Sequence, residues 1–190
     1  MTEPALRLVL RAKSRWSREP YQLLEMRTDG SDGAVLATVR TARMLDRTGL
    51  VFYADEGTTQ PLFAYSGAII REKFEIVDSF GMVLGSFHKV WKSSVLRSTW
   101  QLATADGMTA VGRERNKMVA LMRRFDERIP FVGVHFDFMT DDGQLVLSST
   151  RRRTIIPEYE ITVPTRADGR RLDWRVAAAV GVALEAEQDR

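Results

Sequence analysis

The side chains that could carry acid–base or metal chemistry are sparse in this sequence. It contains no cysteine and two histidines, His88 and His135. Either histidine could act as a base or as a metal ligand. His135 lies two residues from Asp137, so both would share one face of a strand, but a single pair of this kind does not make a metal site. We therefore predict no catalytic residue, no metal and no cofactor.

The motifs of common enzyme classes are missing as well. The sequence has no G-x-S-x-G elbow, no G-x-G-x-x-G or Walker loop, and no H-E-x-x-H zinc motif. The acidic pair Asp141–Asp142 precedes a glycine, where aspartate serves a turn through local hydrogen bonds. The loop Asp29–Gly33 (DGSDG) lacks the ligand spacing and the terminal glutamate of an EF-hand. An enzyme is thus not indicated.

Basic residues near tryptophans are the most suggestive feature. One group surrounds Trp16 in Arg11–Arg18 (RAKSRWSR), a stretch without an acid. The candidate ligand-binding residues come from two further groups: Lys89, Lys92, Arg97, Arg151, Arg152 and Arg153. Cations beside an interfacial tryptophan could bind anionic lipid headgroups, each contributing about 1 kcal/mol. The alternative is a solvated strand face. Nucleic-acid phosphates would suit the same cations, but we rank this partner below lipid.

Composition limits the classes further. The chain has 190 residues, 44% hydrophobic and 28% charged, with a formal net charge of +3. These values are typical of a globular protein, and we predict one domain over residues 1–190, with 1–20 as a partly ordered extension. We find no signal peptide and no apolar run near the roughly 18 residues of a membrane span. The lack of cysteine is compatible with the cytosol, so we expect a cytoplasmic protein.

Short alternating segments separated by glycine turns predict a mainly β fold. Tyr21–Thr28 leads through a D-G turn into a second strand, and Phe74–Asp78 and Val134–Thr140 begin similar hairpins. Within the last of these, Val134, Phe136 and Phe138 would point to one face of the strand, and His135 and Asp137 to the other. About ten or more such strands favour a sandwich or a barrel. A short helix is predicted over Glu114–Phe125.

The stretch Leu172–Glu187 (LDWRVAAAVGVALEAE) is different, because no polar face interrupts it from Val176 to Leu184. Asp173 can cap a helix that starts after it. A helix that is apolar all round is buried in a protein core or in a membrane. Nine residues cover roughly 14 Å, which is about half of a hydrocarbon core. The residues are also mostly small, so we predict a helix in the core rather than a membrane anchor or a partner-binding helix.

The order of many antiparallel strands followed by one apolar helix resembles the tubby C-terminal-like fold. FEIVDSFGMVLGSFHKVWKSSVLRSTW, FDFMTDDGQLVLSSTRR and YEITVP followed by LDWRVAAAVGVALEA are similar to motifs of the bacterial LURP-one-related and phospholipid scramblase-like families. The resemblance covers roughly residues 21–187 and implies a closed barrel of about twelve strands around a central C-terminal helix. The cysteine cluster and the acidic calcium segment of scramblases are absent from this sequence.

Three functional hypotheses follow. The first is a non-enzymatic module that docks anionic phospholipid or phosphoinositide, which would place the protein at the inner face of the membrane. The second is a protein-interaction or structural scaffold without a lipid role. The third is an enzyme of unknown class, which would require a pocket joining His88 or His135 to a carboxylate. A helix-filled barrel leaves little room for such a pocket.

Overall fold

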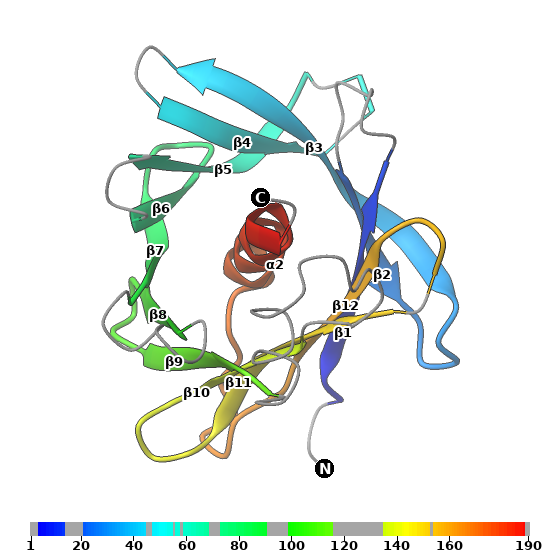
Figure 1. The fold of residues 1–190 in the computed structure, drawn as a ribbon. Helices are drawn as coiled ribbons and strands as arrows, with labels where there is room; N and C mark the ends of the chain where they lie inside the picture. The colour runs from blue at the N-terminus through cyan, green and yellow to red at the C-terminus, as the bar shows by residue number, and fades with distance from the viewer. Residues whose placement is uncertain are drawn as a thin grey trace, which may run out of the picture.

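The chain forms a closed antiparallel β-barrel with one helix at its C-terminal end (Figure 1). A computed structural model describes residues 4–13, 21–44, 47–54, 56–57, 59–68, 73–90, 99–115, 135–152 and 154–188. The elements in these residues are β1 (Leu6–Ala12), β2 (Tyr21–Met26), β3 (Asp32–Met44), β4 (Arg47–Tyr53), β5 (Pro61–Ala68), β6 (Lys73–Asp78), β7 (Val83–Lys89), β8 (Thr99–Thr104), β9 (Thr109–Glu114), β10 (His135–Met139), β11 (Leu145–Arg151), β12 (Glu158–Val163) and α2 (Trp174–Gln188).

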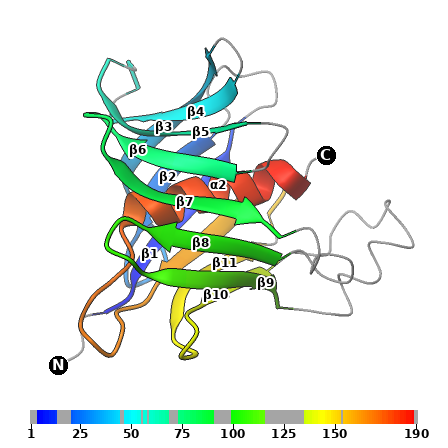
Figure 2. The same cartoon turned by 90° about the vertical axis from the view of Figure 1, so that its left-hand side faces the viewer.

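Each strand pairs with its neighbour in the sequence, and β1 closes the ring by pairing with β12. Figure 2 shows this neighbour-to-neighbour order along one side of the barrel. The twelve strands in the described part of the chain confirm the predicted barrel. The segment Leu6–Ala12 contributes a full strand, β1, so this part of the N-terminal stretch belongs to the barrel wall. Most of the helix predicted over Glu114–Phe125 lies outside the described residues, and Glu114 itself ends β9.

Five turns with the same backbone pattern lie at one end of the barrel. They span 27–31, 78–82, 104–108, 140–144 and 166–170. In each, the N–H of the first residue donates to the carbonyl of the fifth, and the glycine N–H in fourth place donates to the carbonyl of the first. These glycines have φ between 76° and 84°, which only glycine adopts without strain. This explains why glycine recurs at the fourth position of these turns.

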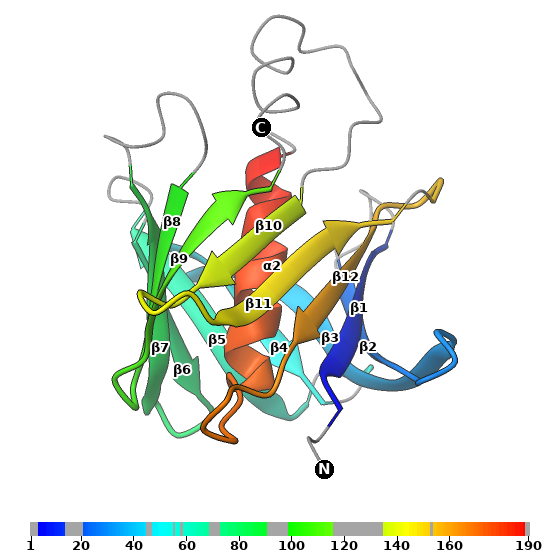
Figure 3. The same ribbon diagram turned by 90° about the horizontal axis from the view of Figure 1, so that it is seen from below.

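The two ends of the barrel therefore differ. Because successive strands are antiparallel, every turn that follows an even-numbered strand lies at the same end, which we call the turn end. The opposite end carries the loop between β11 and β12, and we call it the loop end. Figure 3 shows the starts of β1 and α2 at the turn end, with the end of α2 towards the loop end.

Helix α2 is buried along most of its length. All residues from Val176 to Ala179 have 0% exposure, and α2 contacts β12, β1, β5 and β7. Asp173 caps the helix as predicted, because its carboxylate accepts the N–H of Arg175 at 2.9 Å. In the view of Figure 1 the helix lies within the ring of strands.

The packing around α2 uses a small residue on one side of the helix and large aromatic residues on another. A Cβ at Gly181 would come within 2.4 Å of Cδ1 of Ile161, so a larger residue there would require the Ile161 side chain to move. On another side the gap is filled by aromatic rings, with Phe52 stacked on Phe63 at 4.0 Å and Phe63 edge-on to Trp174 at 5.6 Å. The interior is therefore packed with side chains.

We expect that Ala179→Arg prevents folding. A charge placed without a partner in this core costs several kcal/mol, against a total stability of about 5–15 kcal/mol. Circular dichroism and size-exclusion chromatography would show loss of the native signal. The matched control is Ala167→Arg, at an exposed position in the turn 166–170, which should fold normally. A soluble Ala179→Arg protein with an unchanged melting temperature would contradict the packing described above.

Candidate functional site

The described basic candidates lie at the loop end but not on neighbouring strands. Lys89 ends β7, while Arg151 ends β11 and Arg152 follows it. Three strands separate β7 from β11, which corresponds to roughly 19 Å along the barrel wall at about 4.8 Å per strand. The remaining candidates lie outside the described residues: Lys92, Arg97 and Arg153.

Lys89 lies next to a tryptophan of the neighbouring strand, Trp100. Its Nζ lies 5.9 Å from the centre of the Trp100 ring, at the outer limit of a cation–π contact. Trp100 is only 2% exposed and belongs to the core. This tryptophan is therefore a packing residue, and it is unsuited to contact a membrane surface.

The loop between β11 and β12 combines basic and exposed apolar residues. Ile155 is fully exposed and Ile156 is 54% exposed, three and four residues after Arg152. The two adjacent isoleucines add contiguous exposed apolar surface to a basic loop, and apolar surface rimmed by polar residues is typical of interaction sites. Sequence reasoning missed them, although the run R-R-R-T-I-I-P carries a signal: two β-branched apolar residues between a basic run and a proline.

Hydrogen bonds hold the backbone of this loop in a defined shape. The N–H of Arg152 donates to the carbonyl of Glu158 at 2.8 Å, which continues the strand pairing past the end of β11. The N–H of Thr154 donates to the carbonyl of Arg152 at 3.1 Å. The hydroxyl of Thr154 donates to the carbonyl of Ile156 at 2.6 Å. These bonds use the polar groups of the loop internally and leave the two isoleucine side chains pointing outward.

Ion pairs connect the loop to the barrel wall. Arg152 Nη1 lies 3.3 Å from Glu158, and Arg11 Nε lies 2.6 Å from the same carboxylate. Arg11 also pairs with Asp32 at 2.5 Å. Hydrogen bonds to Asp32 and Glu158 raise the pKa of Arg11. The two acids largely neutralise Arg11 and Arg152, so Arg151 supplies the excess positive charge of this described group.

Among the described residues, His135 does not form a catalytic arrangement with a free carboxylate. His135 and Asp137 share the outer face of β10, as predicted, but Arg115 forms two hydrogen bonds to Asp137, at 2.7 and 2.5 Å. These bonds hold the pKa of Asp137 below its usual value, which makes it a poor base. Burial, and then the charge of Arg115, lower the pKa of His135. Among the described residues, no group of three or more His, Cys, Asp or Glu side chains could hold a metal ion.

The comparisons with known proteins do not assign a family. No protein-family model matches the chain, and no curated protein matches it. The resemblance to LURP-one-related and scramblase-like proteins therefore stays a prediction from the motifs. Within the described residues, no helix has both the length and the apolar character required to span a bilayer.

The position of His135 predicts a pH dependence of stability. Its pKa is lower in the folded than in the unfolded protein, so the unfolded state binds a proton first, and the free energy of unfolding decreases as the pH falls below about 6.5. His135→Gln should make this decrease smaller between pH 7.5 and 5.5, as measured by urea denaturation. His88→Gln, which changes the other histidine, is the control and should retain the decrease. Equal slopes in wild type and His135→Gln would contradict the prediction.

Proposed function

We propose that this protein is a non-enzymatic, tubby-like binding module that docks on anionic phospholipid surfaces through the loop between β11 and β12. The observation that carries the proposal is the exposure of Ile155 and Ile156 in the same loop that follows Arg151 and Arg152. Peripheral membrane proteins combine apolar insertion with attraction to anionic headgroups, because neither contribution alone gives stable binding.

The apolar and electrostatic contributions can be compared in size. Burying an isoleucine side chain that starts fully in water is worth about 1.5–3 kcal/mol. Each arginine near an anionic surface adds about 1 kcal/mol. Ile155 begins fully exposed and Ile156 half-exposed, so the apolar part is the larger one. The defined backbone of the loop reduces the ordering cost on binding.

We further propose that α2 is the central helix of a tubby C-terminal-like barrel. Its burial and its contacts with β12, β1, β5 and β7 support this assignment. In such a barrel the helix takes the place where a lipocalin-type barrel would hold its ligand. Binding would then use the outside and the ends of the barrel. A cytoplasmic protein would meet anionic lipid at the inner face of the membrane.

A protein-interaction scaffold is the second candidate, and one observation favours it. Phe80 and Met82 are 89% and 67% exposed in the turn 78–82 at the turn end. Aromatic and methionine side chains are enriched at protein interfaces. The enzyme hypothesis has less support, because Asp137 is engaged by Arg115 and is unsuited to accept a proton from a substrate.

The apolar part is tested with the double variant Ile155→Ser/Ile156→Ser. In co-sedimentation with phosphatidylglycerol-containing vesicles, we expect its affinity to fall by about tenfold or more, because at least one buried isoleucine is lost. The matched control is Phe80→Ser/Met82→Ser, which removes exposed apolar residues from the turn end and should bind as wild type. If the control and not the loop variant loses binding, the docking surface is the turn end.

The electrostatic part is tested with Arg151→Glu. Reversing this charge should lower the affinity for vesicles containing phosphatidylglycerol or phosphoinositide by about tenfold at low salt, and by less at high salt because of screening. Neutral phosphatidylcholine vesicles should bind weakly to both proteins. The control is Arg170→Glu at the turn end, which should have little effect. Failure of the wild type to bind anionic vesicles at low salt would reject the proposed function and leave the scaffold.

A further inference from the structure

A cleft opens at the turn end, beside the first residues of α2. Its volume is about 900 Å³, within the range of about 300–1,000 Å³ that small-molecule sites occupy. The walls come from the start of β1, from β5 and β7, from the turn 104–108, and from the segment that leads into α2. The cleft lies at the end of the barrel opposite to the loop between β11 and β12.

The lining has an apolar part and a basic part. Leu62, Leu84, Met108 and Trp174 supply apolar surface. The charged side chains are Arg166, Arg171, Arg175, Asp106 and Asp173. Three arginines against two aspartates give the lining a net positive charge. An apolar wall together with an excess of hydrogen-bond donors is the pattern expected for an amphipathic anion.

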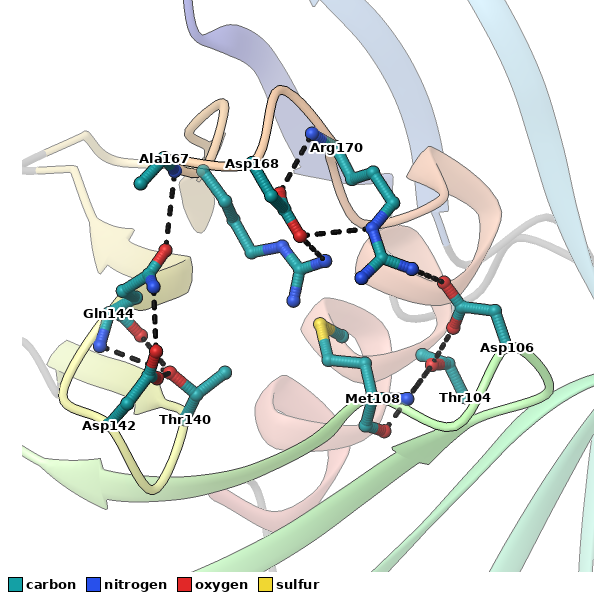
Figure 4. A network of polar contacts seen from close by, with 10 residues as sticks. Thr104, Asp106, Met108, Thr140, Asp142, Gln144, Ala167, Asp168 and Arg170 are labelled. Atoms are coloured by element: carbon teal, nitrogen blue, oxygen red, sulfur yellow. Dashed lines mark hydrogen bonds and ion pairs between the residues drawn. The ribbon is translucent and has the colours of Figure 1, made fainter.

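Both aspartates of the lining already have partners. Asp173 caps α2 and pairs with the guanidinium of Arg175 at 2.6 Å. Asp106 accepts a hydrogen bond from the hydroxyl of Thr104 and lies 4.0 Å from Arg170 (Figure 4). These contacts fix the two carboxylates at the edge of the turn and at the helix cap. The ion-pair partner of Arg166 is a third aspartate, Asp168, which lies outside the lining.

Arg166 is the most buried of these cations and is incompletely satisfied. Its side chain is 11% exposed, and its Nη2 lies 2.8 Å from Asp168. Asp168 is shared, because it also accepts the backbone N–H and the Nε–H of Arg170, at 3.0 and 2.9 Å (Figure 4). Among the described residues, the Nε of Arg166 is buried without a hydrogen-bond partner.

A buried guanidinium N–H without an acceptor is unfavourable, because water has been removed and nothing replaces it. Arginine offers only donors, so the missing group must be an acceptor. A carboxylate or phosphate oxygen matches the geometry and charge of a guanidinium better than a neutral acceptor does. Cationic ligands are disfavoured by the charge of the lining.

We propose that this cleft binds a small amphipathic organic anion, with a carboxylate or phosphate head at Arg166 and an apolar body against Leu62, Leu84 and Trp174. The site is separate from the proposed lipid-docking loop and does not depend on it. Trp174 lies in the lining and edge-on to Phe63, so its fluorescence should report an apolar body that enters the cleft.

Titration calorimetry with the full chain and matched eight-carbon probes tests the proposal. Octanoate and octyl phosphate distinguish the two head groups, while octanol and octylamine keep the apolar body and change the charge. We expect saturable binding of at least one anion, with octanol and octylamine weaker by about tenfold or more, as for the loss of a charge-assisted hydrogen bond. Binding of the anion should change the tryptophan fluorescence of the wild type, and Trp174→Phe should remove this change.

Two arginine variants locate the head group. Arg166→Gln should weaken anion binding by about tenfold or more. Arg170 also binds Asp168 but lies outside the lining. Arg170→Gln is therefore the matched control and should change the anion affinity less than twofold.

If Arg166→Gln does not fold, the probe series and Trp174→Phe still decide the proposal. Octanol binding as tightly as octanoate, equal effects of both arginine variants, or no anion binding at millimolar concentration would overturn it. Ile155→Ser/Ile156→Ser should leave the anion affinity unchanged whether or not the protein binds vesicles.

Discussion

The all-round apolar surface of α2 is the constraint on which the rest of the structure depends. Residues Val176–Leu184 have no polar face that could remain in water, so protein must cover them on every side. A closed antiparallel barrel also pairs every strand and leaves no open edge. The small side chains of α2 permit close approach at Gly181, where β12 supplies Ile161. Aromatic residues of β4 and β5 fill another part of the space beside α2.

Side chains fill the space around α2, and the two ends of the barrel are built differently. At the turn end, repeated five-residue turns with glycine in the left-handed region close the hairpins with short local hydrogen bonds. The segment into α2 must also pass there, because the chain enters the barrel from that side, and the cleft forms beside this entry. At the loop end, the connection from β11 to β12 projects two isoleucines. The same topology thus creates one concave and one projecting surface.

Local patterns predicted the parts of the fold that depend on neighbours in the sequence. The D-G turns, the alternation of Phe136 and Phe138, and the cap at Asp173 follow from turn chemistry, strand period and helix capping. Contacts between residues far apart in the sequence could not be predicted from these local patterns. Arg11 meets Glu158 across 147 positions, and the separation of Lys89 from Arg151 follows only from the strand order. The exposure of Ile155 depends on the direction in which its loop projects. The residue type alone would have predicted a buried side chain, because isoleucine is usually found in the core.

The arginines at the two ends should differ in how salt affects them, and this difference follows from burial. Arg151 and Arg152 lie at a partly exposed rim, where the dielectric constant is high and ions screen a charge within about 8 Å at physiological ionic strength. The Arg166 side chain is 11% exposed, so an anion held there would be screened far less. An effect of salt on vesicle binding without a comparable effect on small anions would therefore identify two separate sites. A shared salt dependence would instead indicate that one exposed basic surface serves both ligands.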